Sequence, residues 1–258
     1  MLPTRHHAIL KLARQQGRVT VDDLVARFDV TPQTIRKDLN DLCDQKLLAR
    51  VHGGAIISSG AENVGYDARR LIAHGEKAAI GKAIAALIPD HSSLFINIGT
   101  TTEAVAQALL QHTGLMVITN DLIVANTMRL YPNIEVNVAC GIVRRADGGI
   151  VGEAAADFIR QFKVDYAVIS ASAIEQDGTL LDLDFREVKV TQAIIANARN
   201  VILAADSTKF ERSAPVRIGD LRQVGTFVTD RCPSEQFRKL AADLGVALIE
   251  ALPRDNSR

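Results

Sequence analysis

The first 55 residues alternate apolar and polar positions at helical spacing in three short segments. This pattern predicts a helix over residues 5–16 and a second helix that Thr20 and Asp23 begin as a capping box. A third helix begins after Thr31. Beyond residue 47 the pattern becomes extended, and Gly53-Gly54 allows a tight turn between two short strands.

The third helix has an apolar back and a polar front. Thr31 is suited to the N-cap position, and Pro32 to the first helical position, where its missing N–H costs nothing. The apolar back consists of Ile35, Leu39 and Leu42, which recur at i, i+4 and i+7. The polar side chains of the opposite face and its flanks are Gln33, Thr34, Arg36, Lys37 and Asn40. Such donors suit base edges and phosphates, although an ordinary solvated helix has the same pattern.

After the first 56 residues, the chain has a polar stretch rich in Gly and Ser at 57–66, which predicts a linker. We therefore divide the chain into an N-terminal domain (1–56), a linker (57–73), a larger domain (74–252) and a tail (253–258). In the larger domain, short apolar strands and helices alternate, which predicts an α/β fold with a doubly wound, largely parallel sheet. The expected strands are 94–98, 115–119, 134–139, 166–170, 201–205, 226–229 and 246–249, and the expected helices are 76–88, 102–111, 121–130, 153–162, 187–198 and 234–244.

Composition sharpens this picture at two points. The 258 residues have a net charge of zero, but residues 1–55 hold nine Lys/Arg and six Asp/Glu, so the head is basic and the rest is acidic. The three cysteines are far apart and have no metal-like spacing, which indicates free thiols in a reducing compartment. No long apolar run or signal peptide is present, so we expect a cytoplasmic protein that binds no membrane, metal or cofactor.

Three expected strand ends carry groups that suit a phosphate. Residues 99–102 (Gly-Thr-Thr-Thr) join a strand to a helix and offer backbone N–H groups, hydroxyls and a helix N-terminus together. Thr119-Asn120 ends the next strand, and Lys209 follows a later strand in Asp-Ser-Thr-Lys. Because ligands bind at the carboxyl ends of parallel strands, these groups predict an anion site.

The head resembles the winged helix-turn-helix of the DeoR family of bacterial repressors. Three stretches carry the resemblance, Val-Thr-Val-Asp-Asp-Leu from residue 19, Val-Thr-Pro-Gln-Thr-Ile-Arg-Lys-Asp-Leu from residue 30, and Leu-Ala-Arg-Val-His-Gly-Gly-Ala from residue 48. Lys37 stands where the family usually repeats arginine, so a bidentate contact is lost. The expected DNA contacts are Thr31, Gln33, Thr34, Arg36, Lys37, Asn40, Arg50 and His52. For His52, an ordinary turn residue is an equal alternative.

The larger domain resembles the sensor domain of the same family, which looks like ribose-5-phosphate isomerase without its catalysis. The matching parts are residues 99–102, Arg-Glu-Val-Lys at 186–189 and Asp-Ser-Thr-Lys at 206–209; the isomerase's acidic strand end is here Ser170-Ala-Ser-Ala. Serines cannot supply a carboxylate base for proton transfer. The expected effector contacts are Gly99, Thr100, Thr101, Thr102, Thr119, Asn120, Arg144, Ser170, Glu187, Lys189 and Lys209.

The resemblance therefore implies a repressor that binds operator DNA as a homodimer or homotetramer. It implies a phosphorylated polyol or sugar as effector, with glycerol 3-phosphate foremost. Asn97 and Cys140 depart from the family pattern at positions where aspartate and glycine are usual, so a different sugar phosphate is an alternative effector. Two other hypotheses stay open, an active sugar-phosphate isomerase with a DNA-binding appendage and an architectural DNA binder.

Overall fold

The computed structural model describes residues 3–252 with the exception of 17, 46, 52 and 58–65. By its internal contacts the chain divides into two compact units, which we call the head (Met1–Ile72) and the larger unit (Ala73–Arg258). Each unit has its own apolar core, and each is described here by itself. The predicted helix at the start of the larger unit begins at His74, close to the dividing point.

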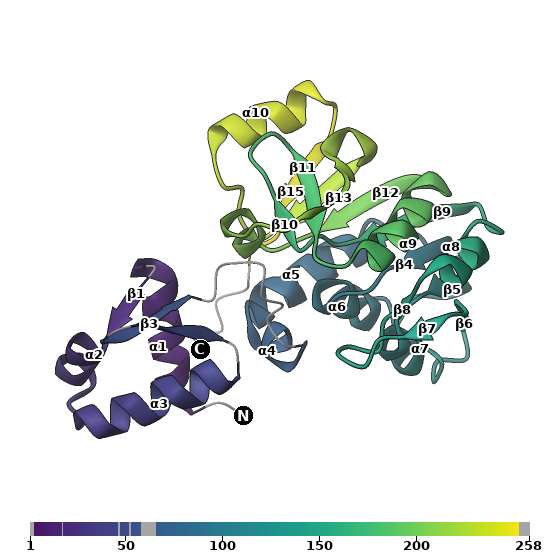
Figure 1. The fold of residues 1–258 in the computed structure, drawn as a ribbon. Coiled ribbons are helices and arrows are strands. Elements are labelled where there is room, and N and C mark those ends of the chain that lie inside the picture. Colours follow the sequence, from purple (N-terminus) through teal and green to yellow (C-terminus); the bar gives the residue numbers. More distant parts are fainter. Residues whose placement is uncertain (1–2, 17, 46, 52, 58–65, 253–258) are drawn as a thin grey trace. The chain divides into compact units, whose positions relative to one another are not determined.

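The head combines three helices with a three-stranded antiparallel sheet (Figure 1). In chain order its elements are α1 (Thr4–Gln16), β1 (Arg18–Thr20), α2 (Val21–Phe28), α3 (Pro32–Asp44), β2 (Leu48–Val51) and β3 (Gly54–Ile57). Strand β3 lies between β1 and β2, and Gly53 turns the chain between β2 and β3 with φ 75°. This arrangement is the predicted winged helix-turn-helix, although β1 was not predicted.

The caps of the head helices follow the sequence, with one difference. Thr31 caps α3 by accepting a hydrogen bond from the backbone N–H of Thr34. Thr20 caps α2 by accepting from the N–H of Asp23 (3.2 Å), but the Asp23 carboxylate accepts from the Thr20 hydroxyl (2.6 Å). A capping box would instead return that side chain to the backbone of the N-cap residue. The predicted linker also contains a helix, α4 (Tyr66–Leu71), which its composition did not indicate.

The larger unit is built on a seven-stranded sheet in which all neighbouring pairs are parallel. Its strands are β4 (Ser93–Ile96), β5 (Leu115–Thr119), β6 (Ile134–Val138), β9 (Val164–Ile169), β12 (Ala198–Ala204), β14 (Thr226–Thr229) and β15 (Ala247–Glu250). The order across the sheet is β15-β14-β12-β9-β4-β5-β6. The chain thus moves from β4 outward to β6, returns to β9 on the other side of β4, and continues outward again.

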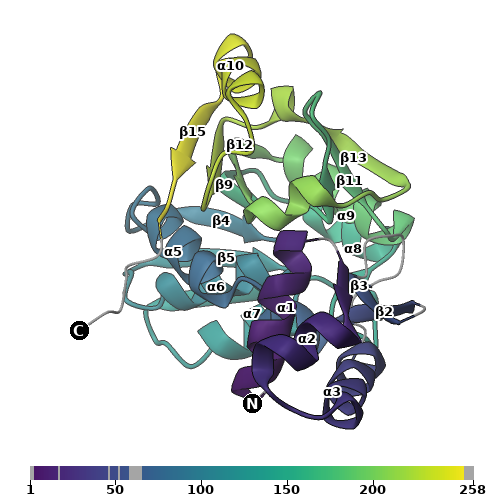
Figure 2. The same cartoon turned by 90° about the vertical axis from the view of Figure 1, so that its left-hand side faces the viewer.

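Helices cover both faces of this sheet (Figure 2). One core joins a face of the sheet to α5 (His74–Ala85), α6 (Thr100–Ala108) and α7 (Leu122–Met128). The other core joins the opposite face to α8 (Glu153–Ile159), α9 (Phe185–Ala196) and α10 (Glu235–Asp243). The change of face makes the carboxyl ends of β4 and β9 a topological switch point, where ligands bind in open α/β sheets. The doubly wound fold is therefore confirmed.

Smaller antiparallel elements lie outside the main sheet, and the sequence pattern predicted none of them. Strands β7 (Ile142–Val143) and β8 (Ile150–Val151) form a ribbon. A second small sheet contains β10 (Ala173–Ile174), β11 (Thr179–Asp182) and β13 (Val216–Asp220), accompanied by two short 3₁₀ helices, η1 (Ser207–Glu211) and η2 (Leu221–Gln223). No helix in the described ranges is both long and apolar enough to cross a membrane.

Candidate functional site

The front of α3 has the exposure that the sequence predicted. Gln33, Arg36, Lys37 and Asn40 are exposed, whereas Ile35, Leu39 and Leu42 on the opposite side are completely buried. Thr31 and Thr34 instead contact each other through their hydroxyl oxygens (2.9 Å) at the start of the helix. The backbone of Arg50 lies in β2, but its side chain, like all of His52, lies outside the described part of the chain.

An ion-pair network fixes the back of α3 to α1. The Asp38 carboxylate, 5% exposed, accepts from the guanidinium of Arg5 (2.5 and 3.1 Å) and contacts His6 Nε2 (3.1 Å). Burial disfavours the charge of Asp38, but the hydrogen bonds from Arg5 and His6 outweigh it and lower the pKa of the carboxyl. Asp38 therefore holds α3 against α1 from inside the head. The helical spacing had left it unassigned.

In the larger unit, the first turn of α6 lies at the switch point. Gly99 is its N-cap with φ 149°, a region open to glycine, and makes no side-chain cap. By contrast, the N-caps Asp121 and Asp184 accept bonds from the first turns of α7 and α9. Backbone N–H groups at a helix start have no partner within the helix. An uncapped helix start is therefore suited to an anion, as the sequence predicted for residues 99–102.

The loop before α6 is supported from several sides. The Thr102 hydroxyl donates to the carbonyl oxygen of Gly99 (2.6 Å), so its proton is used in a hydrogen bond within the loop. The Gly99 N–H donates to Asp121 Oδ2 (3.4 Å). Ser170, which follows β9, lies beside Gly99, because a Cβ placed on that glycine would be 3.5 Å from the Ser170 Cβ. The structure thus brings Ser170 and the loop together, as predicted.

Thr119 and Asn120 end β5 beside this loop, and both are completely buried. The Thr119 hydroxyl donates to the carbonyl oxygen of Ile96 (2.7 Å), and the Asn120 Nδ2 donates to that of Ile150 (3.1 Å). The Thr119 hydroxyl proton and one of the two N–H groups of the Asn120 amide are therefore used within the protein. The role of Thr119 and Asn120 as phosphate ligands stays a prediction.

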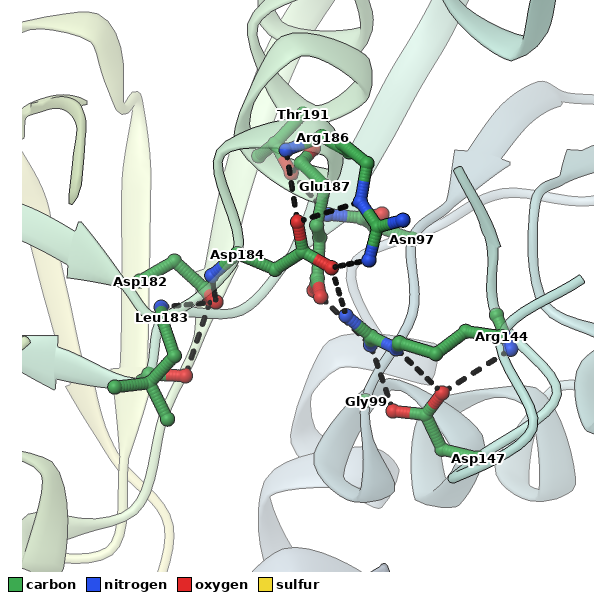
Figure 3. Close-up of polar contacts among 12 residues, drawn as sticks. Asn97, Gly99, Arg144, Asp147, Asp182, Leu183, Asp184, Arg186, Glu187 and Thr191 are labelled. Atoms are coloured by element: carbon green, nitrogen blue, oxygen red, sulfur yellow. Dashed lines mark hydrogen bonds and ion pairs between the residues drawn. The ribbon is translucent and has the colours of Figure 1, made fainter. Parts of the chain in front are cut away.

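A cluster of charged side chains surrounds Arg144 (Figure 3). Its guanidinium, 14% exposed, pairs with Asp147 (2.7 Å), Glu187 (2.7 Å) and Asp184 (3.3 Å). Burial opposes the charge of Arg144, but Asp147 and Glu187 more than offset this and raise the pKa of the guanidinium. Arg186 also pairs with Asp184 (3.0 Å). Arg144 and Glu187 were predicted, whereas Asp147, three residues after Arg144, and Asp184, from a distant segment, were not.

Asp147, Asp184 and Glu187 share the guanidinium groups of Arg144 and Arg186, so the carboxylates of this network outnumber its cations. Burial, and then the charge of Asp182, raise the pKa of Glu187 to about 8, although Arg144 works in the opposite direction. Burial likewise raises the pKa of Asp121, although the hydrogen bonds that its carboxylate accepts from backbone N–H groups lower it. Glu187 therefore releases its proton at a higher pH than an ordinary glutamate.

Positive charge gathers at the end of β12. Burial opposes ionisation of Asp206, yet Lys209 and Lys77 hold the pKa of its carboxyl below the usual range. Lys77 lies in the first turns of α5 and is only 4% exposed, and no sequence motif indicated it. Lys189 turns elsewhere, since its half-exposed ammonium pairs with Glu153 at the start of α8 (3.0 Å). No described cluster of His, Cys, Asp and Glu is arranged to hold a metal ion.

Comparison with known proteins identifies both units. A family model described as the DeoR-like helix-turn-helix domain matches residues 5–60, and one described as the DeoR C terminal sensor domain matches residues 72–231. Together they cover most of the chain.

Several relatives are similar over nearly their full length. The glycerol-3-phosphate regulon repressor of Escherichia coli (strain K12) is 43% identical over 95% of this chain and 97% of its own. Its namesake from Haemophilus influenzae is 46% identical over 89% of both chains, and the E. coli repressor CsqR is 41% identical over 98% and 96%. A ribose 5-phosphate isomerase structure from Methanocaldococcus jannaschii is 14% identical, covers 54% of this chain and 55% of its own, and has a TM-score of 0.40.

Proposed function

Because this chain belongs to the DeoR family of transcriptional repressors, we propose that it binds operator DNA through α3 and that a phosphorylated polyol controls this binding. The effector lies at the carboxyl ends of β4, β9 and β12, and glycerol 3-phosphate is the first candidate. The single observation that carries the proposal is the uncapped start of α6 at the switch point, next to Ser170.

The DNA side of the proposal rests on the exposed front of α3. Arg36 and Lys37 supply positive charge there, and Gln33 and Asn40 supply amides that suit base edges. One small head covers a single half-site, so two or more copies of the chain bind repeated or palindromic half-sites. Binding then weakens with added salt because phosphate contacts release counterions. Light scattering that finds a monomer bound tightly to one half-site would exclude this arrangement.

The identity of the effector rests on chemistry and on kinship. The start of α6 offers N–H donors, and Lys77 and Lys209 both lie close enough to the buried Asp206 to lower the pKa of its carboxyl, so two ammonium groups lie at the end of β12. A phosphate is the common small anion that fits such donors. Glycerol 3-phosphate is named for two relatives that are 43% and 46% identical, which makes it the first compound to test.

A release assay tests this proposal. Duplexes selected by the protein from a random pool are titrated by fluorescence anisotropy, and glycerol 3-phosphate is then added. We expect Lys209→Ala and Thr101→Val to retain DNA binding but to require at least about tenfold more metabolite, since each removes one polar contact. The matched control is Lys239→Ala, which removes an exposed lysine of α10 and leaves the response unchanged. If Lys209→Ala releases DNA at the same metabolite concentration as the wild type, the phosphate is bound elsewhere.

Linkage gives a second, independent readout. If the metabolite weakens DNA binding by some factor, operator DNA weakens metabolite binding by the same factor. Calorimetric titration of the metabolite with and without operator measures it directly. If glycerol 3-phosphate binds the native state alone, it also raises the free energy of unfolding, by about 2.7 kcal/mol at one hundred times Kd, and with it the melting temperature. An architectural DNA binder shows neither effect.

An isomerase is the second candidate, and one observation favours it. The strand end at 170–173 lacks carboxylates, but Asp182, Asp184 and Glu187 approach the same region from other segments, and Glu187 has a pKa of about 8. Against it, Arg144 engages both Asp184 and Glu187, and the relatives are named as repressors. Conversion of ribose 5-phosphate to ribulose 5-phosphate by the purified protein would revive this candidate.

A further inference from the structure

Two buried asparagines lie side by side at the switch point. Asn97 and Asn120 directly follow the paired residues Ile96 and Thr119 of adjacent strands, so they are neighbours at the ends of β4 and β5. Their exposures are 1% and 0%. Since side chains alternate along a strand, both point to the sheet face that packs on α8 and α9, as their bonds to Thr191 and to the backbone of β8 require.

The orientation of each amide is fixed by its partner. The Thr191 hydroxyl donates to the carbonyl oxygen of Glu187 (3.1 Å), so its oxygen accepts from Asn97 Nδ2 (2.8 Å). Asn120 Nδ2 donates to the carbonyl oxygen of Ile150. Each Oδ1 atom therefore points away from its amide's partner. Neither Oδ1 has a hydrogen-bond partner among the described residues.

Two buried acceptors without partners at the ends of adjacent strands are unusual. Buried polar atoms in folded proteins nearly always have a partner, because leaving one unsatisfied is costly. These two are two residues before Gly99 and one residue before Asp121, the groups that shape the start of α6. Asn97 also connects through Thr191 to Glu187 and so to Arg144 (Figure 3). The two asparagines thus lie next to the loop before α6 along the chain, at the carboxyl ends of the strands where the phosphate position is argued above.

We propose that Asn97 Oδ1 and Asn120 Oδ1 accept hydrogen bonds from adjacent hydroxyls of the effector, and so select a polyol phosphate over the corresponding ketone. The inference rests on the proposed function, because it extends the same site. A hydroxyl donates to an acceptor, whereas a carbonyl oxygen facing Oδ1 brings two lone pairs together. Dihydroxyacetone phosphate differs from glycerol 3-phosphate by that one group, which in this proposal faces Asn97, and so leaves the Asn97 amide oxygen unpaired.

Calorimetric titration of the full chain with these two compounds measures the preference. We expect the wild type to bind glycerol 3-phosphate on the order of tenfold or more tightly than dihydroxyacetone phosphate. Asn97→Leu keeps the size of the side chain but removes the acceptor, so the ratio of the two Kd values falls toward one. Asn97→Asp keeps an acceptor and retains the ratio of the two Kd values, even if its charge weakens the binding of both compounds. The matched control is Asn200→Leu, an exposed site in β12.

The outcomes separate this inference from the proposed function. Wild-type protein that binds both compounds equally, or Asn97→Leu protein that keeps the full ratio, overturns the hydroxyl assignment and leaves the repressor proposal standing. A larger ratio in Asn97→Leu means that the amide donates, and also overturns it. Binding of neither compound by the wild type overturns both proposals. If Asn97→Leu does not fold, the wild-type ratio and Asn120→Leu remain decisive.

Discussion

Replacing Glu187 by glutamine removes one ionisable group from the Arg144 network and leaves its shape nearly unchanged. The folded protein holds the Glu187 proton up to a pKa of about 8, whereas the unfolded chain releases it near the ordinary value of 4.5. As pH rises between these values, the unfolded chain binds fewer protons than the folded protein. The free energy of unfolding therefore falls with pH across this window, and the loss is complete above pH 8.

The magnitude follows from the same two values. Each pH unit in the window costs up to about 1.4 kcal/mol, which gives an upper limit of about 5 kcal/mol over the interval from 4.5 to 8. Relaxation around the charge and entry of water reduce that limit, so we expect about 2–4 kcal/mol. Glu187→Gln has no proton to lose there. The variant should differ little from wild type at pH 5 and should be more stable by this amount at pH 8.5.

Urea unfolding followed by tyrosine fluorescence measures this difference, because Tyr131 and Tyr166 lie in the larger unit and only Tyr66 lies in the head. The control is Glu153→Gln. The Lys189 ammonium lowers the pKa of the exposed Glu153 carboxyl, which is therefore ionised throughout the range. Its difference from wild type stays constant from pH 6 to 9. If the Glu187→Gln difference were equally constant, within about 0.5 kcal/mol, Glu187 would not hold a proton and the charge reasoning would be wrong.

Three further outcomes are expected. Arg36→Ala should weaken operator binding by about 1–3 kcal/mol with an unchanged circular dichroism spectrum, and unaltered affinity would remove Arg36 from the interface. Asp38→Ala leaves His6 buried without this partner, and chemical denaturation at neutral pH should show the head to be less stable by about 2–3 kcal/mol. Because the pKa of Asp38 is lowered in the folded protein, this difference should vanish in acid, where the wild-type carboxyl is protonated. Gly99→Ala places a Cβ at φ 149° and 3.3 Å from Thr102 Oγ1, so DNA binding should persist while the metabolite response is lost; a normal response in anisotropy would show that the loop is not the anion site.

Patterns within a few residues of each other predicted much of the fold. The cap at Thr31, the proline after it and the apolar spacing of Ile35, Leu39 and Leu42 are sufficient to place α3, because each acts within a few residues. The buried strands are recognisable for a similar reason, since a parallel strand covered on both faces must be apolar throughout. Strands 115–119 and 226–229 match the structure to the residue.

The two-residue strands and the helix inside the predicted linker were beyond such reasoning. The strands β7, β8 and β10 contain two residues each, too few for any periodicity to be distinguished from a loop. Helix α4 lies in a segment whose composition is typical of a linker. Its boundaries depend on contacts that composition does not report.

For the site, the sequence determined which chemical groups follow the strands, and the tertiary structure decided how they are used. Gly99 and Lys209 were identified from residue type and strand ends alone. The order of the strands made β4 and β9 neighbours and so joined the Gly99 loop to Ser170. It also turned Lys189 toward Glu153.

Charge and hydrogen-bond balance belong entirely to the tertiary structure. Arg144 contacts carboxylates 3, 40 and 43 residues later in the chain, and Lys77 approaches Asp206 from a helix more than a hundred residues earlier. Whether a carboxylate keeps its proton depends on the charges within a few ångströms and on the loss of water around it. Neither quantity is a property of local sequence, because both arise only when distant segments pack together.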